Sequence, residues 1–302
     1  MKLSIIIVSY NTMQLLADCI QSVQTSLGDS ISYEIIVVDN DSKDNSIYML
    51  KTQYPNIKLL ENKYNAGFAK ANNQGLQESS GEYVLLLNSD TIVLGNSINT
   101  LIDFLDRNID TAICGPKLLN SDMTLQLPCR RGFPRLINSI AHFSHISRLF
   151  PKNRILGSYL MTYMDSTQNH EVDAVSGACM LIRPKVLEGI GGLLDEAYFM
   201  HFEDIDLCYR AKKYGFKVYY VHNAEVIHLK GQSSKLRSSG VTRNFFDSAI
   251  IYFRNNYKRE SKTGYFLTAV IIKLMKYFTL AAITLKTGLN KKVQSKSKTI
   301  NQ

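Results

Sequence analysis

The stretch LSIIIVSYN, residues 3–11 of the 302-residue chain, decides the fold. Its first six residues form an almost continuous apolar run rich in β-branched side chains, which ends at Ser9. A run of this length predicts a strand buried on both faces, as in a parallel sheet covered by helices. Because only one Lys precedes the run and no small-residue cleavage site follows it, we interpret it as a first strand and not as a signal peptide.

Outward from this stretch, short apolar segments alternate with segments of helical spacing. Strands are expected at 34–38, 57–60, 83–88 and 111–115, and helices at 12–26, 43–54, 66–79 and 96–108. This alternation predicts an α/β fold with a mostly parallel central sheet flanked by helices. After a less regular middle segment, strands are expected at 176–182, 217–221 and 224–228, and helices at 204–214 and 241–257.

The net charge of +9 is distributed unevenly along the chain. Residues 254–302 contain eleven Lys and Arg and one acid, so this tail carries +10 and residues 1–253 carry −1. A neutral body lacks the basic surface of a nucleic-acid-binding domain, so no nucleic acid is expected as a partner. The five cysteines include no CxxC pair, which favours reduced thiols in a cytoplasmic protein.

Polar clusters follow three of the expected strands. They are Ser9-Tyr10-Asn11, Asp39-Asn40-Asp41 and Asn88-Ser89-Asp90. Such residues also form caps and turns, but ligands of an open α/β sheet bind beyond the carboxyl ends of its strands. Three clusters at successive strand ends therefore favour a binding site. The absence of GxGxxG after the first strand, and of GxxxxGK[ST], argues against a dinucleotide-binding oxidoreductase and a P-loop NTPase.

Two further segments contain candidate catalytic or metal-binding side chains. In FMHFEDIDLCYR, residues 199–210, adjacent Glu203 and Asp204 follow large apolar side chains. Acids at a helix start often balance its dipole, but an apolar approach also raises a carboxyl pKa and suits a general base. Asp206 and Arg210 are expected to pair along the helix. His228 ends a strand and is either structural or a ligand for metal or phosphate.

The stretch between Asp122 and Asp165 contains no acidic residue. Its bases, interleaved with aromatic residues, are Arg130, Arg131, Arg135, Arg148, Lys152 and Arg154. Two interpretations remain open for this insertion, about 123–164. It is either a solvated segment that packs by its aromatic side chains, or a mobile basic segment that faces an anionic substrate.

The tail contains an apolar segment at 265–285, which as a helix would be about 31 Å long and able to cross a bilayer. However, Lys273 and Lys276 lie near its middle, where a Lys costs roughly 2.5–3.5 kcal/mol. Apolar residues share one helix face, namely Leu267, Ile271, Leu274, Phe278 and Leu285, and Lys262, Lys273, Lys276, Thr284 and Thr287 share the other. We therefore expect an amphipathic helix in the membrane plane, with 262–298 contacting an anionic membrane surface. A helix packed on the body is the alternative.

Taken in order, these segments resemble the family 2 inverting glycosyltransferases of the GT-A fold, particularly the rhamnosyltransferase-like branch. The matching segments are VSYN (8–11), VVDNDS (37–42), NKYNAGFAKANN (62–73), LNSD (87–90), SGACM (176–180), FEDIDLCYR (202–210) and VIH (226–228). Each segment alone is weakly specific, but the ordered set is highly specific. The resemblance implies a GT-A domain at 1–253 and a basic amphipathic helical tail at 254–302.

The resemblance also implies roles for individual residues. Asp39 would hydrogen-bond the pyrimidine of a nucleotide-sugar donor, in a pocket lined by Ser9, Tyr10 and Asn11. The nucleotide and diphosphate would lie near Asn65, Gly67, Phe68 and Lys70. Asn88 and Ser89 would begin a DXD-type motif in which Asp90, helped by His228, binds Mn²⁺ or Mg²⁺. Ser176, Gly177 and Ala178 would border the donor sugar, and Asp204 would be the general base with Glu203 as its neighbour.

The activity implied by the resemblance is metal-dependent transfer of one sugar, with inversion, to a hydroxyl of a lipid-linked glycan acceptor. The donor would be a UDP- or dTDP-sugar, dTDP-rhamnose among them, and the enzyme would build cell-surface polysaccharide at the cytoplasmic face of the cell membrane. The absence of a QxxRW motif argues against processive polymerisation. Two alternatives remain. A sugar nucleotidyltransferase would need a Gly-rich loop where Tyr10-Asn11-Thr12 stands, and the other is a non-catalytic nucleotide-sugar-binding or scaffold protein at the membrane.

Overall fold

The computed structural model describes residues 1–229, 239–258 and 261–300, which form two compact units. The first unit contains residues 1–199 and 203–229. The second contains residues 200–202 and the described residues from 239 onward. Each unit has its own packing and is described separately.

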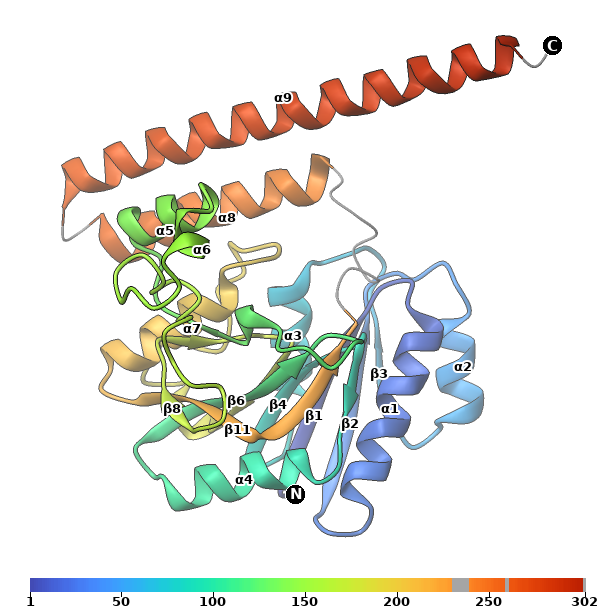
Figure 1. The fold of residues 1–302 in the computed structure, drawn as a ribbon. Helices are drawn as coiled ribbons and strands as arrows, with labels where there is room; N and C mark the ends of the chain where they lie inside the picture. The colour runs from blue at the N-terminus through green and yellow to red at the C-terminus, as the bar shows by residue number, and fades with distance from the viewer. Residues whose placement is uncertain (230–238, 259–260, 301–302) are drawn as a thin grey trace. The chain divides into compact units, whose positions relative to one another are not determined.

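A nine-stranded sheet forms the centre of the first unit (Figure 1). Its strands are β1 (Leu3–Ser9), β2 (Tyr33–Asp39), β3 (Lys58–Glu61), β4 (Tyr83–Asn88), β5 (Thr91–Val93), β6 (Thr111–Leu119), β8 (His170–Glu171), β10 (Cys179–Ile182) and β11 (Lys217–His228). The order is β3-β2-β1-β4-β10-β6-β11-β5, with β8 beside β11. Strands β3, β2, β1 and β4 are parallel, as are β6 and β11, whereas β10 runs antiparallel between β4 and β6. The predicted mostly parallel α/β sheet is confirmed.

Helices cover the sheet because its strands are apolar on both faces. They are α1 (Met13–Leu27), α2 (Ser46–Gln53), α3 (Phe68–Gln77), α4 (Ser97–Arg107) and α7 (Glu203–Lys213). Helix α1 contacts α2 and α4, and α3 contacts β1 and β2. The close approach of α3 depends on Gly75, because a Cβ at that position would lie 2.4 Å from Ile6 Cγ2. Ile5, Ile6 and Ile7 are completely buried, so the opening apolar run is the centre of the core.

Two strand predictions were wrong in detail. The segments 217–221 and 224–228 form one strand, β11, with an irregular register between Val221 and Glu225. The chain stays extended there because His222, opposite no regular partner, donates its N–H to Asn169 Oδ1 at 2.9 Å. The strand expected from Ser176 begins at Cys179, because the Cys179 N–H bonds the Ser176 carbonyl in a turn.

The insertion between β6 and β10 is partly packed. It contains η1 (Leu127–Cys129), β7 (Arg130–Arg131), α5 (Leu136–Phe143) and α6 (Ile146–Leu149), and β7 pairs with β9 (Ala174–Val175). A short η2 (Pro184–Val186) follows β10. Tyr159 is buried, whereas Phe143 and Phe150 are 39% and 53% exposed. Its aromatic residues therefore serve packing only in part.

The second unit contains α8 (Ser239–Tyr257) and α9 (Lys262–Ile300). Helix α9 packs on α8, with Thr268, Ala269 and Ile272 buried and Lys276 Nζ 2.5 Å from Asp247 Oδ1. Lys276 therefore pairs with an acid of the neighbouring helix. Segment Lys262–Thr284, in which an 18-residue window has a mean hydropathy of 1.8, is long and apolar enough to cross a membrane. The side chains from 285 onward, including the Lys-rich end Lys291–Lys298, lie outside the described residues.

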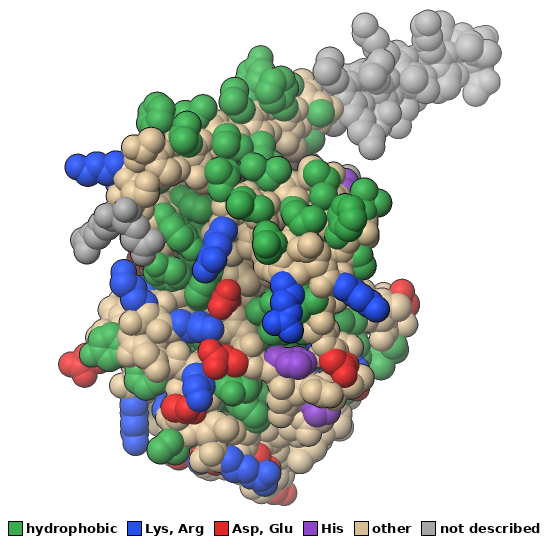
Figure 2. All heavy atoms as spheres, turned by 60° about the vertical axis from the view of Figure 1, so that its left-hand side comes forward, with side chains coloured by type: hydrophobic (Ala, Val, Ile, Leu, Met, Phe, Trp, Pro, Cys, Tyr) green, Lys and Arg blue, Asp and Glu red, His purple; other side chains and the backbone are tan. Residues whose placement is uncertain are grey.

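The apolar face of α9 is left open within its unit. Large hydrophobic residues on it are more than one-third exposed, namely Phe266, Leu267, Val270, Leu274, Tyr277 and Phe278. Figure 2 shows hydrophobic side chains at the surface, with Lys and Arg side chains among them. Such a contiguous row of exposed apolar side chains is unusual for the surface of a soluble domain.

Candidate active site

Asp39 occupies the carboxyl end of β2 and is completely buried. Its Oδ1 accepts the Ser42 N–H at 2.8 Å, whereas Oδ2 has no hydrogen-bond partner among the described residues. The Asn11 N–H donates to Ser42 Oγ, and Asn11 Oδ1 accepts the Lys43 N–H, so the ends of β1 and β2 are joined. Leaving a buried carboxylate oxygen without a donor is costly. This oxygen is therefore suited to accept a hydrogen bond from a ligand.

The segment 62–68 is held against the same strand end by Asn40. Asn40 Oδ1 accepts from Asn62 Nδ2 at 2.9 Å, and Asn40 Nδ2 donates to the Gly67 carbonyl at 3.3 Å. Asn65 Oδ1 accepts the Gly67 N–H at 3.0 Å. Gly67 has φ +84°, and a Cβ there would lie 2.7 Å from the Phe199 carbonyl oxygen. Glycine is therefore required where the chain before α7 crosses this segment.

Two of the predicted residues lie at the edge of this arrangement. Lys70 Nζ donates to Tyr64 Oη at 3.2 Å on the first turn of α3. Tyr10 is 41% exposed just beyond β1, next to the Ser9 hydroxyl group, which lies 3.1 Å from Thr12 Oγ1. Ser9 is buried and paired in register with Asp39, so it lies inside the arrangement.

The end of β4 places Asp90 beside His228. His228 Nε2 lies 3.4 Å from Asp90 Oδ1, and both residues are buried. Asn88 and Ser89 fix this turn, because the Asn88 N–H bonds the Ala178 carbonyl and Ser89 Oγ accepts from Thr12 Oγ1. The end of β4 is therefore tied to both β1 and the 176–178 turn.

Gln126 determines the tautomer of His228. Its Nε2 donates to Asn120 Oδ1 and to the His228 carbonyl, so its Oε1 accepts from His228 Nδ1 at 2.8 Å. This hydrogen-bond network assigns the proton of neutral His228 to Nδ1 and turns the Nε2 lone pair toward Asp90. An imidazole lone pair facing a carboxylate fits a cation between them.

The described residues contain no group of three or more His, Cys, Asp or Glu that would hold a metal ion. A divalent cation beside Asp90 and His228 would have at most these two side chains as ligands and would need other oxygens, such as those of a diphosphate.

Asp204 lies at the start of α7, against the turn that precedes β10. The Gly177 N–H donates to Asp204 Oδ2 at 3.0 Å, and Arg131 Nη2 donates to the same oxygen at 2.6 Å. A Cβ on Gly177 would lie 3.3 Å from Asp204 Cβ and 3.6 Å from Phe68 Cε1. The structure therefore brings Gly177, Phe68 and Asp204 together. Ser176 and Ala178 flank them, joined by a bond from the Ala178 N–H to Ser176 Oγ.

The adjacent acids Glu203 and Asp204 differ in protonation. Burial opposes ionisation of Asp204, but Arg131 and the Gly177 N–H hold the pKa of its carboxyl group below the ordinary value. Burial, together with the negative charge of Asp204, raises the pKa of Glu203 to about 8. Glu203 Oε2 has no partner among the described residues. At neutral pH Asp204 is therefore the carboxylate and Glu203 the carboxylic acid.

Sequence reasoning missed three residues of this arrangement as site residues: Arg131, Gln126 and Asn40. Arg131 was recognised only as one base of the insertion, although the pair Arg130-Arg131 between apolar residues is an unusual buried position for two cations. Gln126 carries no sequence signal, because its partner His228 is 102 residues away. Asn40 was quoted in its polar cluster without a role of its own.

Comparison with known proteins identifies the family. Residues 4–191 match the family model described as glycosyl transferase family 2. The chain is 30% identical over 220 residues, 69% of this chain and 70% of the relative, to the N-acetylglucosaminyl-diphospho-decaprenol L-rhamnosyltransferase of Mycobacterium tuberculosis. It is 28% identical over 233 residues, 75% of this chain and 66% of the relative, to the low-salt glycan biosynthesis hexosyltransferase Agl10 of Haloferax volcanii.

Solved structures share the fold. S. aureus TarS 1–349 in complex with UDP-GlcNAc has a TM-score of 0.58 at 16% identity, covering 83% of this chain and 65% of that one. GalNAc-T7 with UDP, GalNAc and Mn²⁺ has a TM-score of 0.59 at 16% identity, covering 84% and 47%. With the family match and the strand-end site, these likenesses show that the chain belongs to glycosyltransferase family 2 and has the GT-A fold.

Proposed function

We propose that the protein is an inverting glycosyltransferase that moves one sugar from a UDP- or dTDP-sugar to a hydroxyl group of a lipid-linked glycan acceptor, in the synthesis of a cell-surface polysaccharide. The observation that carries this proposal is the ionised Asp204 held beside Gly177 and Phe68, at the carboxyl ends of strands that also carry Asp39 and Asp90. The names of the relatives support the acceptor class, because one acts on a diphospho-decaprenol-linked sugar.

Asp39 supports the proposal of a uracil or thymine nucleotide. Its unpartnered Oδ2 accepts a hydrogen bond and cannot donate one while ionised. Uracil and thymine present an N3–H donor, whereas cytosine presents an acceptor at N3. A buried acceptor at this position therefore favours the first two bases, since a cytosine would leave two acceptors facing each other.

Asp90 and His228 would hold Mn²⁺ or Mg²⁺, as their facing carboxylate and imidazole lone pair allow. When bound, such an ion neutralises the charge that develops on the leaving nucleoside diphosphate. Gln126 keeps the His228 ring oriented toward Asp90, and Ser89 holds the turn that carries Asp90. These side chains preorganise the site for the diphosphate.

Asp204 is the proposed general base. Its Oδ2 is held by Arg131 and the Gly177 N–H, and among the described residues its Oδ1 accepts only the Ile205 N–H, so a second lone pair of Oδ1 is suited to take the acceptor proton. As the acceptor hydroxyl group loses its proton to Asp204, its oxygen attacks the anomeric carbon on the face opposite the leaving nucleoside diphosphate. This single displacement inverts the configuration at that carbon. Glu203 stays protonated and adds no competing charge.

We further propose that α9 attaches the enzyme to the cytoplasmic face of the cell membrane. Its packing residues Thr268, Ala269 and Ile272 face α8, while Leu267 and Phe278 are 54% and 66% exposed. A bilayer surface would cover this open apolar face. The lipid-linked acceptor would then be reached at the surface where it resides.

The test is a screen of purified protein against UDP-, dTDP- and GDP-sugars with Mn²⁺ or Mg²⁺, read by thermal shift and by donor hydrolysis. We expect a thermal shift and hydrolysis with UDP- or dTDP-sugars, and Asp204→Asn should keep the shift but lose hydrolysis. A shift without hydrolysis by the wild type would instead indicate a non-catalytic binding protein. Substantial hydrolysis by Asp204→Asn would contradict its role as base.

A further inference from the structure

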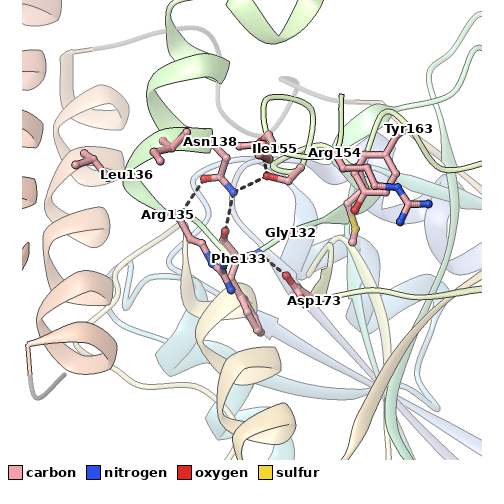
Figure 3. A pocket seen from close by; sticks show the side chains of 12 residues that line it. Gly132, Phe133, Arg135, Leu136, Asn138, Arg154, Ile155, Tyr163 and Asp173 are labelled. Carbon is pink, nitrogen blue, oxygen red and sulfur yellow. Dashed lines mark hydrogen bonds between the residues drawn. The ribbon is translucent and has the colours of Figure 1, made fainter. Parts of the chain in front are cut away.

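A pocket of about 660 Å³ lies in the insertion (Figure 3), and neither Asp39 nor Asp90 is among the residues that line it. This volume is within the range of small-molecule sites. Its walls come from two parts of the insertion: the chain entering α5, with Phe133 and Arg135, and the chain after α6, with Arg154, Ile155 and Tyr163. Asn138 joins the walls, because its Nδ2 donates both to the Phe133 carbonyl and to Ser158 Oγ.

The pocket combines two unpaired cations with a largely apolar lining. Arg135 and Arg154 are exposed and form no ion pair with any described residue, and Arg154 lies over the Tyr163 ring at 5.8 Å. Asp173 is the acid in the lining, but its carboxylate is already engaged by Lys212 Nζ at 3.1 Å and by the Phe133 N–H at 3.0 Å. The net field at this pocket is therefore positive, and an anion would find two free guanidinium groups.

Aliphatic side chains extend from the pocket to the surface. Ile137 and Ile155 both line it and are 63% and 65% exposed. Elsewhere in the same insertion, Leu149 and Phe150 are also 76% and 53% exposed. Large apolar side chains held outward next to free arginines match a ligand that is anionic at one end and hydrocarbon at the other.

Adjacent residues of the chain connect the pocket to the proposed base, Asp204. Arg131, which bonds Asp204 at 2.6 Å, is followed directly by Gly132, a lining residue. Gly132 is pressed against the other wall, since a Cβ there would lie 2.4 Å from the Ser158 carbonyl oxygen. The next residue, Phe133, packs its ring at 5.1 Å on Tyr209 of α7, the helix that begins with Glu203 and Asp204. The pocket lining therefore continues directly into the residues that contact Asp204 and α7, as an acceptor with its sugar at Asp204 and its diphosphate in the pocket would require.

We propose that this pocket binds the lipid diphosphate of the acceptor, with Arg135 and Arg154 on the diphosphate and Ile137 and Ile155 on the first isoprenoid units. The proposal rests on the proposed function for the reaction but names a separate subsite. Of the second interpretation of the insertion, a mobile basic segment that faces an anionic substrate, it keeps the anionic substrate without the mobility and restricts the contact to the bases that line the pocket.

The test measures binding of farnesyl diphosphate to the full-length protein by isothermal titration calorimetry, with farnesol and inorganic diphosphate as half-ligands. Farnesyl diphosphate should bind at least 10-fold more tightly than either half-ligand. The double variant Arg135→Gln/Arg154→Gln should weaken farnesyl diphosphate binding by 10-fold or more. Ile137→Ser/Ile155→Ser should weaken farnesyl diphosphate binding but leave inorganic diphosphate binding unchanged.

The matched control is Arg148→Gln/Lys152→Gln, which removes the same charge from the same insertion at two positions outside the pocket lining. It should leave farnesyl diphosphate binding within 2-fold of wild type. Equal losses in the two charge variants, or binding to vesicles of anionic lipid without binding of farnesyl diphosphate, would overturn the proposal. A thermal shift with UDP is measured on every variant. If it persists while lipid diphosphate binding is absent, the subsite fails and the proposed function stands.

Discussion

Arg131→Met tests whether Arg131 keeps the carboxyl group of Asp204 ionised. The ion pair has a 2.6 Å contact, and both side chains are only 12% exposed. Removing one partner of such a buried pair leaves the other charge uncompensated and costs roughly 3–5 kcal/mol. Arg131 Nη2 also donates to the Val175 carbonyl at 2.9 Å, and this bond is lost as well. We expect the variant to lose roughly 3–5 kcal/mol of unfolding free energy at pH 7, measured in urea.

The same substitution should change the pH dependence of transfer. In the wild type, burial would raise the pKa of Asp204, and Arg131 is the largest cause holding it down. The stability that comes from ionised Asp204 is therefore present above the carboxyl pKa of the unfolded chain and is lost as the pH falls through the lower folded value. Without Arg131, burial prevails and the folded pKa rises. The acid limb of kcat/KM should move to higher pH by about one unit or more.

Two further variants distinguish the effect of the Arg131 charge on the pKa of Asp204 from a general loss of stability. Arg131→Lys keeps a cation and should leave the acid limb close to that of the wild type. Arg130→Gln removes a neighbouring buried Arg, which bonds the Met164 carbonyl at 2.8 Å and lies over the Tyr220 ring. It should lose stability without moving the acid limb. If Arg131→Met and the wild type share one acid limb, Arg131 does not control the pKa of the base.

The remaining predictions concern other parts of the chain. Asp39→Asn should weaken UDP binding by about 10-fold and reduce the preference for UDP over CDP, because an amide both donates and accepts hydrogen bonds. An unchanged preference would show that Asp39 does not recognise the pyrimidine of the nucleotide. Asp90→Ala should abolish the Mn²⁺-dependent part of UDP binding in calorimetry, and unchanged metal dependence would count against this ligand. Burial raises the pKa of Glu203 to about 8, so wild-type stability falls as the pH rises from the unfolded value, 4.5, through about 8. Between pH 6 and 9 the wild type should lose on the order of 2 kcal/mol of unfolding free energy in urea titrations, and Glu203→Gln should remove this loss. Replacing exposed Leu267 and Phe278 by Ser should reduce sedimentation with anionic vesicles several-fold, and undiminished sedimentation would exclude this face of α9.

The parallel half of the sheet was predictable because its strands are nearly continuous apolar runs. The predicted segments 83–88 and 34–38 match β4 and all but the ends of β2. The short strand β5 was missed, since three residues after a turn carry no periodic signal. The single strand β11 was divided in the prediction because polar His222 and Asn223 interrupt its pattern, and a partner 53 residues away keeps them extended.

In the proposed site, contacts along one helix or one strand end were predictable, and contacts between distant segments were not. The expected pair Asp206–Arg210 is confirmed, with Arg210 Nε 2.8 Å from Asp206 Oδ2, because helical spacing alone brings the two side chains together. The partners Arg131 and Asp204 are 73 residues apart, and their meeting depends on the two-residue pairing of β7 with β9. No local pattern specifies such a contact.

Glu203 and Asp204 differ in protonation because Arg131 of the insertion contacts only one of them. Both carboxyl groups are buried at the start of α7, and burial alone would neutralise both. Arg131 and the Gly177 N–H contact only Asp204, so its charge is retained, and that charge in turn raises the pKa of Glu203. The residue that keeps the proposed base ionised is thus bonded to the first residue of the pocket lining. A substrate that shifts Gly132 would also shift Arg131, so the proposed acceptor binding and the ionisation of the proposed base would depend on the same short segment.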